Sequence, residues 1–189
     1  MDPDILLSKA LLRLLWAMTT QQEVRDAQWI AAAVDAARKH RAMIVAWETF
    51  LYTAEQQMSV LNGMPIPGSP EYKPTTPCAI LAAKRQLLAS FVEAPQKLGS
   101  WINYLQITDF DCSEINQVRK SVRTTLDKVK NWHDIRNLAA HHSDFTSQPD
   151  EVIAWYEAIG RVPVAEINEV WDAILRLGIL ASSLTAARI

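Results

Sequence analysis

The distribution of glycine and proline constrains the fold of this chain most strongly. Neither residue occurs between Thr20 and the pair Asn62-Gly63, and the alternation typical of strands is hardly visible. Thr20 and Glu23 have the spacing of a capping box, in which two side chains bind free backbone N–H groups at a helix start. We therefore predict one long helix, or two nearly continuous ones, over residues 20–61.

Proline after a capping residue marks two more helix starts. Asp2-Pro3 and Thr76-Pro77 each place a side chain that accepts backbone N–H bonds directly before a proline in the first helical turn. The helix from Thr76 is expected to kink or end at Pro95 or Gly99. Glycine and five prolines are concentrated in residues 62–77, which we interpret as the one clear loop.

Three further helices are expected in the second half of the chain: from Ser113 to about His142, from residue 149, and over residues 161–187. Seven tryptophans and only five glycines indicate a rigid, helix-rich interior. A chain of 189 residues is long enough to enclose one core. We predict an all-α fold, an antiparallel bundle of about six helices, in a single domain over residues 1–189.

Charge and cysteine usage exclude several functional classes. The formal net charge of -2 gives the whole molecule no bias toward nucleic acid or anionic membrane. Cys78 and Cys112 lack metal-ligand spacing, and no apolar run has the length of a membrane span. The beginning also lacks the basic-then-apolar order of a secretory signal. We expect a cytoplasmic protein without a metal, a cofactor or membrane contact.

The helix from Ser113 carries an apolar stripe that continues into polar residues. The stripe consists of Ile115, Val118, Val122, Leu126 and Val129. Continued at the same step, it predicts inward positions at His133, Arg136 and Asn137, where burial without partners costs several kcal/mol. Alternatively, the buried face rotates after Val129 and leaves these side chains and His141 in solvent. Periodicity leaves both interpretations open.

The sequence "IRNLAAHH" resembles the signature of the HEPN superfamily (higher eukaryotes and prokaryotes nucleotide-binding). That signature is an arginine, commonly followed by a polar residue, then a histidine after four to six intervening residues, late in a helical bundle. Arg136, Asn137 and His141 match with four intervening residues, and His142 would match with five. The ending "AAHH" particularly resembles the abortive-infection branch. The resemblance covers about ten residues and the all-helical layout.

The resemblance implies a metal-independent endoribonuclease of a prokaryotic defence or toxin type, with an antitoxin-like protein as a candidate partner. His141 would transfer protons, Arg136 would stabilise charge on the phosphate, and Asn137 would orient either group. Arg136 and His141 point about 140° apart on a regular helix, because five residues advance about 500°. A two-fold homodimer brings one copy's Arg136 near the other's His141.

The same helix carries a basic run that is a candidate RNA-binding face. Between residues 117 and 133 it holds five basic residues and one acid, a local charge of 5 - 1 = +4. The basic residues are Arg119, Lys120, Arg123, Lys128 and Lys130. We predict that Arg119, Arg123, Lys130 and the nearby His133 bind substrate. The alternative is a solvated helix face without a ligand.

Three other interpretations stay open. The polar motif residues would also suit a non-catalytic helical module that dimerises or binds a nucleotide-like ligand. A metal site from His133, His141, His142 and Asp144 requires two histidines two turns apart to share one ion. Cys112, before the predicted helix start at Ser113, is either a thiol whose pKa the helix dipole lowers or a packed cysteine.

Overall fold

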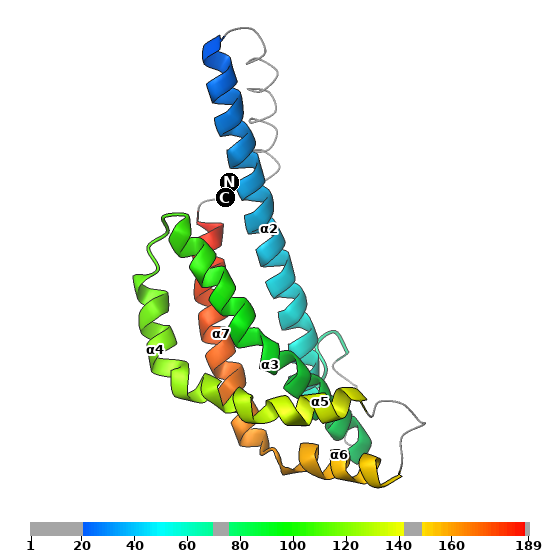
Figure 1. Cartoon of the computed structure of the whole chain (residues 1–189). Coiled ribbons are helices and arrows are strands. Elements are labelled where there is room, and N and C mark those ends of the chain that lie inside the picture. The colour runs from blue at the N-terminus through cyan, green and yellow to red at the C-terminus, as the bar shows by residue number, and fades with distance from the viewer. Residues whose placement is uncertain (1–20, 70–75, 142–148, 188–189) are drawn as a thin grey trace. The chain divides into compact units, whose positions relative to one another are not determined.

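The computed structural model describes residues 21–69, 76–141 and 149–187, and over these residues the protein is all-helical (Figure 1). This confirms the predicted all-α class. The helix predicted at Asp2-Pro3 and the capping residue Thr20 lie outside the described residues. No helix within the described part of the chain combines the length and apolarity needed to cross a membrane.

The chain divides into two compact units. Among the described residues, 21–48 and 182–187 belong to the first unit, and 49–69, 76–141 and 149–181 belong to the second. In the first unit, Ile30, His40 and Trp47 of helix α2 (Gln21–Leu61) are buried. Helix α2 has the bounds predicted for one uninterrupted helix. The second unit contains every residue of the predicted motif.

Helix α3 (Pro77–Ile107) begins where the sequence predicts. Thr76 is its N-cap, and the Thr76 hydroxyl oxygen accepts a hydrogen bond from the backbone N–H of Ala79 at 3.2 Å. The helix continues through Pro95 and Gly99 to Ile107, so the expected ending at either residue does not occur. Pro95 removes one backbone hydrogen bond, but the buried residues Ala94 and Leu98 beside it keep the helix packed on the core.

The helix predicted over residues 113–142 is interrupted. Helix α4 (Ser113–Asp127) is followed by a 3-10 helix, η2 (Lys128–Trp132), and then by α5 (His133–His141). Figure 1 shows that the axis changes direction at η2 between α4 and α5. The remaining helices, α6 (Pro149–Arg161) and α7 (Val164–Ala186), agree with the predicted segments.

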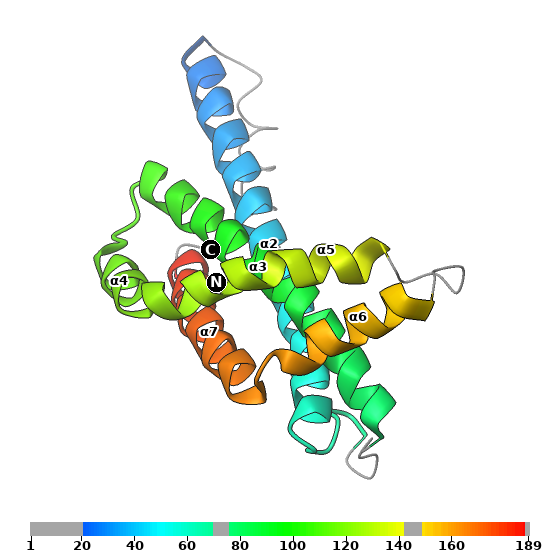
Figure 2. The same ribbon diagram turned by 60° about the horizontal axis from the view of Figure 1, so that its bottom comes forward.

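Stacked aromatic rings form the centre of the second unit. The rings of Phe91 in α3 and Trp171 in α7 are stacked, 5.7 Å apart and 3° from parallel. Phe50 lies 6.3 Å from both rings. Helix α3 also contacts η2, α5 and α6, and α5 contacts α6 (Figure 2). The motif helix α5 is therefore packed against two neighbours, with α3 as its main support.

Candidate functional site

The apolar stripe of α4 is buried as predicted, up to the start of η2. Ile115, Val122 and Val129 are buried, while Val118 and Leu126 are half-buried. The helix begins after Cys112, and the carboxylate of Asp111 accepts a hydrogen bond from the backbone N–H of Ser113 at 3.0 Å. The period of 3.6 residues thus predicted the packing of α4 correctly.

The stripe does not continue into α5. A 3-10 helix advances about 120° per residue, whereas an α-helix advances about 100°. Over the four steps from Val129 to His133, the 3-10 conformation therefore rotates the side chains of α5 by up to about 80° relative to a continuous α-helix. His133 and Asn137 are exposed, whereas Ile135 and Arg136 are half-buried. The inward positions predicted for His133 and Asn137 are wrong. For these two residues the alternative, a rotation of the buried face after Val129, is confirmed.

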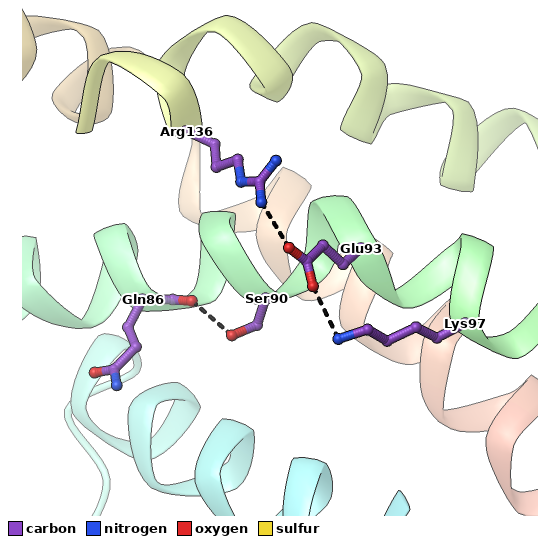
Figure 3. Close-up of polar contacts among 5 residues, drawn as sticks. All are labelled: Gln86, Ser90, Glu93, Lys97 and Arg136. Carbon is purple, nitrogen blue, oxygen red and sulfur yellow. Dashed lines mark hydrogen bonds and ion pairs between the residues drawn. The ribbon is translucent and has the colours of Figure 1, made fainter. Parts of the chain in front are cut away.

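Of the two motif residues with described side chains, Arg136 turns toward the protein, with 32% of its side chain exposed. Its Nη2 atom donates to Glu93 Oε1 of α3 at 2.6 Å (Figure 3). The other oxygen, Glu93 Oε2, lies 2.8 Å from Lys97 Nζ. Within the part of the chain that the structure describes, the guanidinium makes no further hydrogen bond. One edge is fixed by Glu93, and the other has no partner among the described residues.

The electrostatic surroundings keep Glu93 ionised. The hydrogen bond and the charge of Lys97 lower the pKa of Glu93 from its ordinary value of 4.5, and the charge of Arg136 lowers it further. Burial acts in the opposite direction and is outweighed. At neutral pH a carboxylate is therefore present to orient the Arg136 side chain.

The 3-10 helix is bound to the first two turns of α7. Trp132 Nε1 donates to Glu166 Oε1 at 2.9 Å. The ammonium group of Lys128 pairs with the carboxylate of Glu169, and this hydrogen bond raises the pKa of Lys128. Glu166 and Glu169 are three residues apart, so both lie on the same face of α7. Two carboxylates of one helix thus bind η2.

The basic run contains cations that form an ion pair with a described residue and cations that do not. Arg119, Lys120 and Arg123 are exposed and form no ion pair with any described residue. Lys130 instead pairs with Asp127 at 2.7 Å, a contact that lowers the pKa of Asp127. A surface pair of this kind still exchanges readily with solvent. Arg119, Lys120 and Arg123 of α4 are defined here as the basic face.

One predicted catalytic residue, His141, is described only in part. His141 is the last residue of α5, but its side chain, like His142 and Asp144, lies outside the described part of the structure. Among the described residues no three His, Cys, Asp or Glu side chains are grouped so that they would hold a metal ion. The structure therefore fixes the place of His141 along the chain and leaves its catalytic role as a prediction.

Cys112 is a packed cysteine. Its side chain is buried, and burial together with the charge of Asp111 raises its pKa above 9.0. The alternative in which the helix dipole lowers this pKa is wrong, because desolvation of the thiolate dominates.

Sequence reasoning missed the carboxylates that support α5 and η2. One signal was present for Glu93, which is the only acidic residue in the 31 residues of α3. A lone carboxylate on a largely apolar helix indicates a specific cationic partner. Glu166 and Glu169 carry no comparable signal, because acidic residues are common in the first turns of helices.

Comparison with known proteins gave no further identification: no family model, no curated protein and no solved structure matches this chain.

Proposed function

We propose that this protein is an HEPN-like, metal-independent endoribonuclease of a prokaryotic defence or toxin type that works as a homodimer. Arg136, Asn137 and His141 are the proposed catalytic residues. The basic face and His133 are the proposed RNA contacts, with Lys130 joining once it leaves Asp127. No metal or cofactor takes part. A cytoplasmic location and an antitoxin-like protein partner belong to the same proposal.

The observation that carries the proposal is the orientation of Arg136. A guanidinium has a planar fork of N–H donors that matches a phosphate. Glu93 holds one edge of this fork through Nη2, and the opposite edge is left without a partner among the described residues. An arginine held in this way is prepared to bind a phosphate without reorganisation of its side chain, as stabilisation of a transition state requires.

The proposed reaction is transfer of the phosphate to the ribose 2′-oxygen. His141 removes the proton of the 2′-hydroxyl, the 2′-oxygen attacks phosphorus, and the bond to the 5′-oxygen breaks. The leaving 5′-oxygen takes up a proton, which gives a 2′,3′-cyclic phosphate and a free 5′-hydroxyl. Arg136 stabilises the charge on the phosphate oxygens, and Asn137 orients the phosphate or the imidazole.

A dimer follows from the proposed chemistry. Positions 136 and 141 both belong to α5, and on a regular helix two positions with this spacing point about 140° apart. Arg136 is directed toward α3, so we expect that a single copy cannot present both groups to one phosphate. Two copies related by a two-fold axis pair the arginine of each with the histidine of the other.

The first test is cleavage of single-stranded RNA by purified protein in EDTA. We expect the wild type to cleave, and Arg136→Ala and His141→Ala each to lose at least about a hundredfold in rate. Arg161→Ala is the matched control, because Arg161 is exposed on α6 and its one ion pair among the described residues is with Glu157 of the same helix. Equal cleavage by all four proteins would reveal a contaminant and overturn the proposal, as would no cleavage.

Complementation tests the shared site. Arg136→Ala and His141→Ala subunits are mixed after denaturation and refolded together. A composite site predicts that mixed dimers regain activity, because one of their two sites combines the intact arginine with the intact histidine. Failure to regain activity, with mixed dimers demonstrated by mass spectrometry, would contradict the shared site.

The interhelical polar contacts favour one second candidate, a non-catalytic module that dimerises or binds a nucleotide-like ligand. Arg136 already has a carboxylate partner, and such a pair also suits a purely structural network. In that case the wild type shows no cleavage, while Arg136→Ala weakens dimerisation or nucleotide binding. Sedimentation and titration with nucleotides separate the two candidates.

A further inference from the structure

The 3-10 helix η2 interrupts a segment whose local sequence gives no reason for an interruption. Residues 113–141 contain neither glycine nor proline, the usual causes of helix breaks. Five residues of 3-10 helix are also more than most proteins contain in one run, because the hydrogen-bond geometry is poorer than in an α-helix. The cause must therefore lie in contacts with other parts of the fold.

Two kinds of contact favour the 3-10 conformation. Residues three apart eclipse each other in a 3-10 helix, and Val129 and Trp132 have this spacing and are both buried. In an α-helix they would point about 60° apart. In addition, Glu166 accepts the hydrogen bond of the Trp132 indole, and Glu169 pairs with Lys128. The 3-10 conformation thus allows Val129 and Trp132 to face the core together, and Glu166 and Glu169 of α7 bind the two ends of η2.

The conformation of η2 sets the orientation of α5. If residues 128–132 were α-helical, the stripe ending at Val129 would place His133 and Asn137 close to the core register. With η2 as a 3-10 helix, both are exposed and Arg136 meets Glu93. The rotation of up to about 80° thus decides whether His133 and Asn137 of α5 are exposed or buried.

We infer that Glu166 and Glu169 are positioning residues: by holding η2 as a 3-10 helix they keep His133 and Asn137 turned outward and Arg136 against Glu93. The consequence for catalysis rests on the proposed function. The effect on the orientation of α5 does not, because it is measured without RNA.

Thiol labelling at position 133 tests the orientation. His133→Cys is introduced in a Cys78→Ser background, since Cys78 is exposed and would also react. We expect rapid reaction with a maleimide. When Glu166→Ala and Glu169→Ala are added, position 133 turns toward the core and labelling slows by about tenfold, the effect expected from losing a charge-assisted hydrogen bond. Asp172→Ala is the matched control, an exposed carboxylate on the same helix with no ion pair among the described residues.

The direction of the change distinguishes reorientation from loosening. A merely destabilised protein would label at the same rate or faster, and that result, with helicity retained by circular dichroism, would overturn the inference. A further variant exchanges the charges of the Lys128–Glu169 pair through Lys128→Glu and Glu169→Lys, and it keeps Glu166. Because the ion pair can form again in the reversed order, we expect rapid labelling of position 133. Slow labelling in the reversed pair would also count against the inference.

RNA cleavage supplies the second readout. If the wild type cleaves RNA, the Glu166→Ala, Glu169→Ala double variant is expected to lose about tenfold in kcat with a smaller change in KM, because the basic face on α4 is unaffected. Slowed labelling with unchanged kcat would refute the positioning role. If the wild type does not cleave RNA, the proposed function fails, and the labelling experiment alone decides the orientation of α5.

Discussion

Glu93 of α3 joins Arg136 of α5 through a 2.6 Å contact between Oε1 and Nη2, and the same carboxylate binds Lys97 of its own helix through Oε2. The contact connects two residues that are 43 positions apart in the sequence. It holds a half-buried guanidinium in a defined direction. The proposed site therefore depends on a residue outside the motif.

Replacing Glu93 is expected to disturb the orientation of Arg136 with little effect on the free energy of unfolding. In Glu93→Ala, Arg136 loses its fixed direction, and RNA cleavage should fall by about tenfold. The free energy of unfolding should change by no more than about 1 kcal/mol, because the Glu93 side chain is 41% exposed and solvent screens the pair. Rate measurements and urea unfolding check both expectations.

Lys97→Ala is the matched control for this variant. It removes the other cation bound to Glu93 and leaves the contact with Arg136 intact. Cleavage by Lys97→Ala should therefore stay within about twofold of the wild type. An equal loss in both variants would show that the orientation of Arg136 is not the cause.

The titration of Glu93 gives a prediction for pH. Because its pKa is lowered from 4.5, the folded protein holds this proton less tightly than the unfolded chain. The stabilisation from its ion pairs is therefore fully present above pH 4.5 and is lost as pH falls through the lowered pKa. Carbon NMR of the Glu93 carboxyl should show a midpoint below 4.5. Lys97→Ala should raise it more than Arg136→Ala, and the reverse order would contradict the assigned cause.

The basic face predicts the salt dependence of RNA binding. Each phosphate contact with single-stranded nucleic acid contributes about -0.7 to the slope of log K against log salt. Replacing Arg119, Lys120 and Arg123 with alanine should reduce the magnitude of the slope by about 2. Lys130→Ala should change it less, because Lys130 is paired with Asp127. Fluorescence anisotropy at several salt concentrations measures the slope, and an unchanged slope in the triple variant would exclude this face as the RNA contact.

The two cysteines should differ strongly in reactivity. Cys78 is exposed, whereas Cys112 is buried and its pKa is raised above 9.0, so little thiolate is present at neutral pH. We expect a maleimide to modify Cys78 faster by on the order of a hundredfold, because Cys112 reacts only through local opening. Peptide mass spectrometry gives both rates in one experiment. Similar rates would show that the turn before α4 opens readily.

The aromatic stack predicts the largest loss of stability. Phe91 is fully buried against Trp171. Phe91→Ala should lower the free energy of unfolding by about 3–5 kcal/mol, because it removes the ring and leaves a cavity. Phe91→Leu should cost less, since it keeps most of the volume. Urea unfolding followed by circular dichroism provides the comparison, and a loss below about 1 kcal/mol for alanine would contradict the assigned core.

The sequence by itself determined which segments are helical and most of the helix starts, but not the interruption at η2. Thr76 accepts the predicted capping bond, and α6 begins at Pro149 as expected. These features follow from hydrogen bonds and steric limits within a few residues, so local sequence is sufficient. The buried stripe from Ile115 to Val129 was equally accessible, because it depends only on the helical period.

Only the tertiary structure decided which way the motif faces. The hydrogen bonds of a 3-10 helix have poorer geometry than those of an α-helix, so contacts outside the segment, the burial of Trp132 and the carboxylates Glu166 and Glu169, selected the 3-10 conformation of η2. That choice exposed Asn137 and gave Arg136 its partner. The α7 carboxylates that favour this conformation lie more than 30 residues away in the sequence. The local pattern near residue 133 therefore could not predict it.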